Sequence, residues 1–217
     1  MSNTPRLRRF RQPVLALACS IGVLAAAAAS PATGQGATPP RLETAVFAGG
    51  CFWGVDAVFK HVKGVSEVIS GYSGGAAETA HYDRVSEGDT GHAESVQVRF
   101  DPARVSYPQL LQVFFTVAHD PTQLNRQEHD VGTQYRSAIF YANPQQRDAA
   151  QAYIRQLTDA HVFPRPIVTQ LTPLIRFYPA EAYHQNYLAL HPYQPYIVFN
   201  DQPKLARLRS MLPALYQ

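Results

Sequence analysis

One cysteine of this chain, Cys51, lies in a sequence context that favours a reactive thiol. Cys51 lies in the segment Gly-Gly-Cys-Phe-Trp-Gly at residues 49–54, between a short apolar run and an amphipathic one. This order predicts a strand, a glycine turn and a helix whose first turn carries the thiol. Unpaired N–H groups and the helix dipole stabilise a thiolate there, so we expect the pKa of Cys51 to lie below the ordinary value of about 8.5. The alternative is an inert cysteine in a core helix, a common fate of free cysteines.

The neighbours of Cys51 favour the reactive interpretation. Two adjacent glycines let a substrate approach the main chain closely. Phe52 and Trp53 follow directly, and Trp53 is the only tryptophan in the chain. The other cysteine, Cys19, lies in a segment typical of a removable leader, so the mature chain would hold one thiol. An unpaired cysteine in an exported protein is a candidate reactive thiol.

A carboxyl group is the second candidate for chemistry. Glu94 has the same parity as Val96, Val98 and Phe100 in an alternating strand, which turns its side chain toward the apolar face. Burial raises the pKa of a carboxyl group, and a carboxylic acid that stays protonated near neutral pH can act as a general acid. The alternative is an exposed glutamate at the end of a strand.

Strands and helices must position these two side chains. We expect strands near residues 44–48, 65–72, 94–100 and 137–141, helices near 52–62, 106–118 and 145–160, and an extended segment at 167–177. The mixture predicts an α+β fold, a two-layer sandwich with a mostly antiparallel sheet and a ferredoxin-like core. Beyond Tyr187 the prolines at 192, 195 and 203 predict a C-terminal extension that is largely coil.

The first 32 residues have the features of an export signal. Four arginines and no acidic residue precede an alanine-rich apolar run at 14–29, which is shorter than the ~20 residues that span a bilayer. We expect a cleaved export signal over 1–32, a flexible tether over 33–41, a catalytic domain over 42–217 and a periplasmic location. A retained anchor is the alternative.

The charge of the mature chain excludes two classes of partner. Four of the 19 basic residues lie in the leader, which leaves 15 basic against 16 acidic residues and a net charge of about −1. The basic character of the whole chain therefore belongs to the leader. Neither a nucleic acid nor a membrane surface is indicated as a partner.

Six blocks of the sequence resemble, in order, the peptide methionine sulfoxide reductase A family. They are GGCFWG at 49–54, GYSGG at 71–75, TGHAE at 90–94, HDPTQLNRQ at 119–127, DVGTQYRS at 130–137 and AEAYHQ at 180–185. Together they span most of the mature chain. The resemblance implies thiol-dependent reduction of methionine-S-sulfoxide, free or in oxidised proteins and peptides, to methionine.

The resemblance also implies roles for individual residues. Cys51 would attack the sulfoxide sulfur and become a sulfenic acid, while Glu94 would protonate the oxygen. The remaining implied contacts are hydrogen bonds to that oxygen from Tyr82 and Tyr135, an enclosure for the methyl group made by Phe52 and Trp53, and a substrate or water contact from Asp130.

The C-terminal region departs from many members of that family. Relatives often carry further cysteines there, which resolve the sulfenic acid as a disulfide, whereas residues 188–217 contain none. Residues 128 and 129 also differ from the glycine and asparagine that are frequent before the aspartate. The resemblance therefore implies an external thiol reductant, either a thioredoxin-like protein or a small dithiol. We expect no bound cofactor or metal, and a monomer.

Two other classes of function remain open on the residues alone. A cysteine hydrolase or acyltransferase would combine Cys51 with an acid and with His92 or His184. A non-catalytic module would bind methionine-containing peptides and carry an inert thiol. No hydrolase signature accompanies these histidines, and the 8 histidines show no metal-ligand spacing such as HExxH.

Overall fold

Six strands form one mixed sheet in the computed structural model, which describes residues 41–217. Their order is β7-β6-β1-β3-β2-β8, which puts β1 and β3 in the middle. The strands of this sheet are β1 (Glu43–Gly49), β2 (Val65–Ser73), β3 (Ala93–Phe100), β6 (Ser137–Tyr141), β7 (Gln170–Pro173) and β8 (Phe177–Pro179). Two further short strands pair with each other, β4 (Arg126–Gln127) and β5 (Asp130–Val131).

The pairings within the large sheet are antiparallel except one. β6 and β7 run parallel, because the long helix α4 carries the chain back along the sheet between them. The predicted α+β class is confirmed. The finer prediction of a ferredoxin-like core with a mostly antiparallel sheet is not confirmed, since the sheet is mixed.

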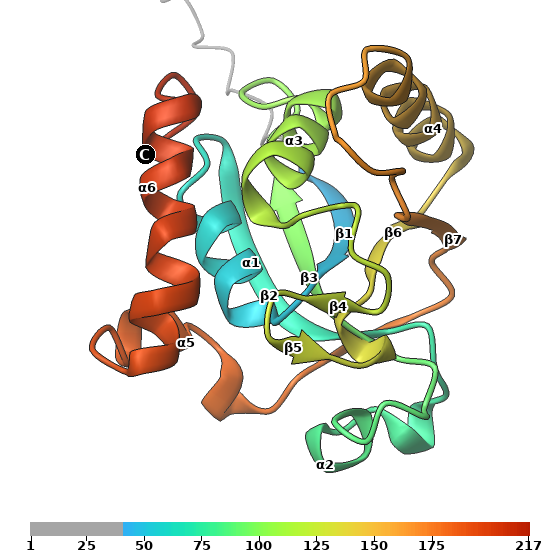
Figure 1. Ribbon diagram of the computed structural model, residues 1–217, viewed down its shortest axis with the longest axis vertical. Coiled ribbons are helices and arrows are strands. Elements are labelled where there is room, and N and C mark those ends of the chain that lie inside the picture. The colour runs from blue at the N-terminus through green and yellow to red at the C-terminus, as the bar shows by residue number, and fades with distance from the viewer. Residues whose placement is uncertain (1–40) are drawn as a thin grey trace, which may run out of the picture. The chain divides into compact units, whose positions relative to one another are not determined.

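Helices pack on the sheet and on one another. Helix α1 lies on β2 and β3, and α6 runs along the outer side of α1 (Figure 1). The α-helices are α1 (Phe52–Lys60), α2 (Tyr82–Val85), α3 (Tyr107–Val113), α4 (Pro144–Asp159), α5 (Tyr187–Leu190) and α6 (Gln202–Met211). Single 3₁₀ turns occur at Ala77–Thr79, Thr133–Tyr135 and Ala182–His184, and π-helical turns at Phe114–Ala118 and Ile197–Asp201. No helix within residues 41–217 is long and apolar enough to cross a membrane.

Helices α3 and α4 begin at the capping residues that the sequence predicted. The Ser106 hydroxyl accepts the Gln109 N–H at 3.4 Å, and the Gln109 amide oxygen accepts the Ser106 N–H at 2.8 Å, which is a capping box for α3. The Asn143 side chain accepts the Gln146 N–H at 2.9 Å and caps α4. The predicted helix over 106–118 reaches Ala118, with its last five residues in a π-helical turn.

The prediction that the C-terminal region is largely coil is wrong. The chain forms α5, a π-helical turn and then α6, a helix of ten residues that packs on α1. Pro203 does not break α6, because it stands in the first turn, where a missing N–H costs no helical hydrogen bond. The buried Leu208 anchors the helix to the core. The expected extended segment at 167–177 contains β7, and β8 begins at its end.

The main core lies between β1 and the helices. The Phe47 ring of β1 stacks on Phe59 of α1 and on Phe114, with centroids 5.0 Å apart in both pairs. Alternate residues of a strand face opposite sides of a sheet, so Val46 packs with Phe140 in a smaller apolar cluster on the other face. Both faces of β1 are thus buried, which fixes the strand that leads into Cys51. The expected export signal over 1–32 and all but the last residue of the expected tether lie outside the described residues.

Candidate active site

The turn between β1 and α1 presents Cys51 at the start of the helix. Gly50 has φ of +89°, a conformation that favours glycine, and a Cβ built on it would lie 2.6 Å from Cγ of Gln127. Cys51 is the N-cap residue of α1. The predicted strand, glycine turn and helix are confirmed, and two independent constraints require glycine at position 50.

Glu94 lies next to this turn. Its side chain is 3% exposed, and Oε2 accepts the Phe52 main-chain N–H at 3.0 Å. Burial raises the pKa of Glu94 to about 8, the hydrogen bond from Phe52 opposes that rise, and the carboxyl groups of Asp130 and Asp201 add to it. The alternative of an exposed glutamate at the end of the strand is therefore wrong. At neutral pH most molecules carry a protonated Glu94.

The pKa of Cys51 departs from the expectation. Burial raises it well above the ordinary value for a thiol, and the negative charges of Glu94 and Asp201 raise it further. A hydrogen bond from the Trp53 main-chain N–H lowers it, as expected at a helix start, but this effect is the smaller one. The prediction of a lowered pKa is wrong, because removal from water outweighs the helix terminus. In the resting protein the thiol keeps its proton.

Tyr82 and Tyr135 come from two separate segments beside Cys51. Burial raises the pKa of both hydroxyl groups, and negative charge on Glu94 and Cys51 raises it further, which places these two groups within electrostatic reach of both tyrosines. Both hydroxyls stay protonated at neutral pH and can donate hydrogen bonds. Glu181 fixes the start of α2, because its Oε1 accepts the Tyr82 N–H at 2.9 Å.

Phe52 and Trp53 form part of an aromatic cluster. Phe52 is fully buried, with its ring centroid 5.0 Å from that of His184. Trp53 stacks on Tyr187 with centroids 3.7 Å apart, and its indole N–H donates to Nδ1 of His184 at 3.2 Å. The centroid of the Tyr82 ring lies 4.5 Å from that of the His184 ring. His184 therefore links three of the predicted site residues.

Asp130 has a partner that the sequence did not predict. Its carboxylate accepts a hydrogen bond from the Tyr196 hydroxyl, across 66 residues of chain. Burial raises the pKa of Tyr196, and negative charge on Cys51 and Asp130 raises it further, so this hydroxyl also lies near the thiol. Asp201 is a second group that sequence reasoning missed. Both stand in the C-terminal segment for which coil was predicted, and nothing in their spacing signalled a site.

The two histidines of the hydrolase alternative are held by other groups. Nδ1 of His92 accepts the Gly75 N–H at 3.2 Å, and Nε2 lies 2.9 Å from the Ala76 carbonyl oxygen. Nδ1 of His184 accepts a hydrogen bond from the Trp53 indole N–H. Within residues 41–217 no histidine ring is hydrogen-bonded to Cys51, and no group of three or more His, Cys, Asp or Glu side chains is placed to hold a metal ion.

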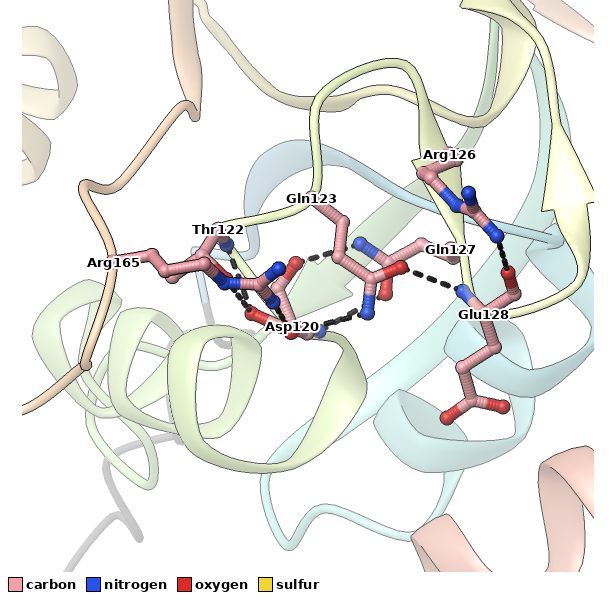
Figure 2. Close-up of polar contacts among 7 residues, drawn as sticks. All are labelled: Asp120, Thr122, Gln123, Arg126, Gln127, Glu128 and Arg165. Atoms are coloured by element: carbon pink, nitrogen blue, oxygen red, sulfur yellow. Dashed lines mark hydrogen bonds and ion pairs between the residues drawn. The ribbon is translucent and has the colours of Figure 1, made fainter.

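The loop at residues 119–128 is organised around Asp120 (Figure 2). The Asp120 carboxylate accepts hydrogen bonds from the Thr122 N–H and hydroxyl, the Gln123 amide and the Arg165 guanidinium, at 2.7 to 3.1 Å. The Gln127 amide pairs with the Asp120 main chain through bonds of 3.0 and 2.7 Å. Since Gln127 packs against Gly50, this network supports the turn that carries Cys51. Glu128 has φ of +52°, a left-handed conformation that favours glycine.

Comparisons with known proteins agree with this arrangement. The family described as peptide methionine sulfoxide reductase matches residues 43–214. The peptide methionine sulfoxide reductase MsrA 2 of Mesorhizobium japonicum is 59% identical, over 82% of this chain and 91% of the relative. The protein of the same name from Synechocystis sp. is 54% identical, over 77% of this chain and 78% of the relative.

Solved structures of similar fold give the same result. Mxr1 from Saccharomyces cerevisiae in reduced form superposes with a TM-score of 0.67 and 32% identity, covering 72% of this chain and 90% of that one. Methionine sulfoxide reductase A of Corynebacterium diphtheriae gives a TM-score of 0.63 and 36% identity, covering 73% and 80%. The family match covers most of the chain, including Cys51 and Glu94, and the chain therefore belongs to the peptide methionine sulfoxide reductase family.

Proposed function

We propose that Cys51 is the nucleophile and Glu94 the proton donor in reduction of the S epimer of methionine sulfoxide. Membership of the family gives the reaction class, which is thiol-dependent reduction of methionine sulfoxide to methionine. One observation carries the assignment to these residues. The Glu94 carboxyl group is hydrogen-bonded to Phe52 N–H, in the helix turn that Cys51 caps.

The protonation states support this division of roles. A protonated Glu94 can deliver its hydrogen to the sulfoxide oxygen, which makes the sulfur electrophilic. The Cys51 sulfur then bonds to the sulfoxide sulfur, and its lost proton replaces the one that Glu94 delivered. Transfer of the oxygen to Cys51 releases the thioether and leaves a sulfenic acid. Both groups start neutral, so no charge has to be buried before the substrate arrives.

The aromatic residues complete the proposed site. The Tyr82 and Tyr135 hydroxyls stay protonated and would hydrogen-bond to the sulfoxide oxygen as negative charge develops on it. Phe52 and Trp53 would enclose the methyl group, with Trp53 held by Tyr187 and His184. Asp130 would fix substrate or water through a carboxylate that Tyr196 orients.

The proposal extends to the state of the protein in the cell. We propose that residues 1–32 are removed on export, that 33–41 form a tether, that the enzyme acts as a periplasmic monomer, and that it accepts both oxidised proteins and peptides. Fractionation of cells that express the full chain, with N-terminal sequencing and the mass of the released protein, tests the removal of residues 1–32 and the periplasmic location. Sedimentation tests the oligomeric state. A protein retained in the cytoplasm at full length would contradict the export proposal.

Epimer-resolved turnover tests the reaction. A peptide carrying each sulfoxide epimer is incubated with the protein and dithiothreitol, and a nitrophenyl ester is assayed in parallel. We expect reduction of the S epimer only, because one enzyme serves each sulfoxide epimer, and loss of that reduction in Cys51→Ser. Consumption of both epimers contradicts the stereochemical proposal, and cleavage of the ester with no reduction would favour the hydrolase.

A further inference from the structure

A cavity of about 500 Å³ opens beside Cys51 and is lined mainly by residues outside the predicted site. Of the predicted site residues, Cys51 and Asp130 line it, whereas Phe52, Trp53, Tyr82, Glu94 and Tyr135 do not. The loop at 119–130, organised by Asp120 as Figure 2 shows, forms one wall, and residues 196–211 form another. The Cys51 side chain therefore meets two environments, a crowded aromatic one and an open one of a size that small molecules occupy.

Lys204 holds a fixed position in the cavity wall. Its Nζ lies 3.2 Å from Oδ1 of Asp201, a carboxyl group that is completely buried and whose other oxygen has no hydrogen-bond partner within residues 41–217. A Cβ built on Gly54 would lie 2.2 Å from Oδ1 of Asp201 and 2.7 Å from Nζ of Lys204. The pair is thus pressed against the first turn of α1, the turn that Cys51 caps.

We propose that this cavity admits the reducing thiol to oxidised Cys51, and that Lys204 holds the incoming sulfur as a thiolate. The inference rests on the proposed function, because that function oxidises Cys51 to a sulfenic acid. Residues 41–217 contain no second cysteine that could reduce it. The thiol would then reach the Cys51 sulfur through the cavity, which Phe52 and Trp53 do not line.

The chemistry balances with an external thiol as the co-reactant. The thiolate attacks the Cys51 sulfur, the S–O bond breaks, and the departing hydroxide takes a proton to form water. A mixed disulfide between Cys51 and the reductant results. A second thiolate attacks the sulfur of the reductant, which forms the reductant's disulfide and releases Cys51 as a thiolate that regains a proton. Two thiols are oxidised for each sulfoxide reduced.

The rim of the cavity suits either of two sources of thiol. Phe199, Met211 and Val162 line it and are 78%, 55% and 51% exposed, an apolar rim of the kind that contacts a protein. The volume also accommodates a small dithiol whole. Both sources share one chemistry, a thiol entering past Lys204, so the experiment uses one probe of each kind.

The test isolates reduction of the sulfenic acid from its formation. The full chain carrying Cys19→Ser is oxidised by one turnover with a methionine sulfoxide peptide, and methionine release is recorded. It is then mixed with dithiothreitol or with a purified thioredoxin-like protein, and the second-order rate constant for loss of the sulfenic acid is measured between pH 6 and pH 10.

Two variants change the cavity in different ways. Lys204→Met with Asp201→Asn removes the ion pair without leaving an unpaired buried carboxylate. Val162→Trp places a larger side chain in the cavity lining and leaves the Lys204–Asp201 pair intact. This variant tests the use of the cavity if the double variant does not fold. The matched control is Lys60→Met with Asp56→Asn, which removes a second lysine paired with a buried aspartate on α1, at 2.8 Å and away from the cavity.

We expect the double variant to lose about tenfold in the rate of re-reduction near pH 7, relative to its own rate of methionine release. A thiolate in the cavity would contact Lys204, which lines it, and not Asp201, which does not, so the loss of the ammonium group outweighs the loss of the carboxylate. That gap should close above about pH 9, where free thiols ionise without help. Val162→Trp should slow re-reduction at every pH, and the control pair should not. A loss confined to one reductant identifies which source uses the cavity.

Unchanged re-reduction by both thiols in both cavity variants overturns the inference. That result is distinguishable from failure of the proposed function, which would show itself earlier, as absence of methionine release from the parent chain before any thiol is added.

Discussion

The Glu94 carboxyl group accepts the main-chain N–H of Phe52 at 3.0 Å, across 42 residues of chain. The bond ties the middle of the sheet to the helix turn that begins at Cys51. The bond lowers the pKa of Glu94, but burial outweighs it and raises that pKa to about 8, and burial also raises the pKa of the neighbouring Cys51 thiol. The effects of changing Glu94 can therefore be separated into chemistry, stability and thiol ionisation.

Glu94→Gln should abolish most of the chemistry while preserving the shape of the site. The amide oxygen can still accept the Phe52 N–H, but the side chain no longer delivers a proton as an acid. We expect a loss of ~10²–10⁴-fold in methionine release during a single turnover, with little change in peptide affinity. Glu67→Gln, at an exposed glutamate of β2 that pairs with Arg99, is the matched control. A variant that reduces the sulfoxide at nearly the parental rate would show that Glu94 is structural.

The same variant should be more stable than the parent at alkaline pH. The pKa of Glu94 is raised on folding from an ordinary value of 4.5 to about 8, so the folded state loses stability as pH rises from the first value to the second. Glutamine has no proton to lose. Relative to the parent, we expect the free energy of unfolding of Glu94→Gln to rise by up to about 4 kcal/mol between pH 4.5 and pH 8. Urea titrations at both pH values measure it, and a difference that is independent of pH would contradict it.

The ionisation of Cys51 should respond to Glu94. Burial and the neighbouring carboxylates raise the pKa of the thiol, so alkylation by iodoacetamide should reach half its limiting rate only above the ordinary thiol value of about 8.5. Replacing Glu94 by glutamine removes a negative charge and should shift this midpoint to lower pH. A parent chain alkylated at its limiting rate already at pH 7 would contradict the buried, protonated thiol.

A chain with Cys51 as its only thiol should stop after one turnover. With Cys19→Ser and no added reductant, each molecule should release about one equivalent of methionine, because a sulfenic acid needs a second thiol to be reduced. Intact mass should show one added oxygen, and a sulfenic-specific reagent should label the Cys51 peptide. Cys51→Ser should release none. Repeated turnover without any thiol would exclude this scheme.

Local signals in the sequence determined the framework of the site. The glycine turn before Cys51, the capping box at Ser106 and the alternation that buries Glu94 depend on residues only a few positions apart, so their physics is contained in the sequence. Motif order then identified the family, which the comparisons show. Pro203 misled the prediction of the C-terminal region, because a proline in a first helical turn and a proline in coil look alike in sequence.

Tertiary structure alone decided the charge state of the site. A helix start by itself lowers the pKa of a thiol, but α1 is covered by α6 and the sheet, and burial reverses the direction for Cys51. Tyr196 and Asp201, from the C-terminal segment, join Asp130 and Gly54 only after the chain has folded. Desolvation depends on every atom that packs around a group, and those atoms come from segments far apart in the sequence, such as Glu94, Gln127 and Asp201 around the start of α1, which no local pattern specifies.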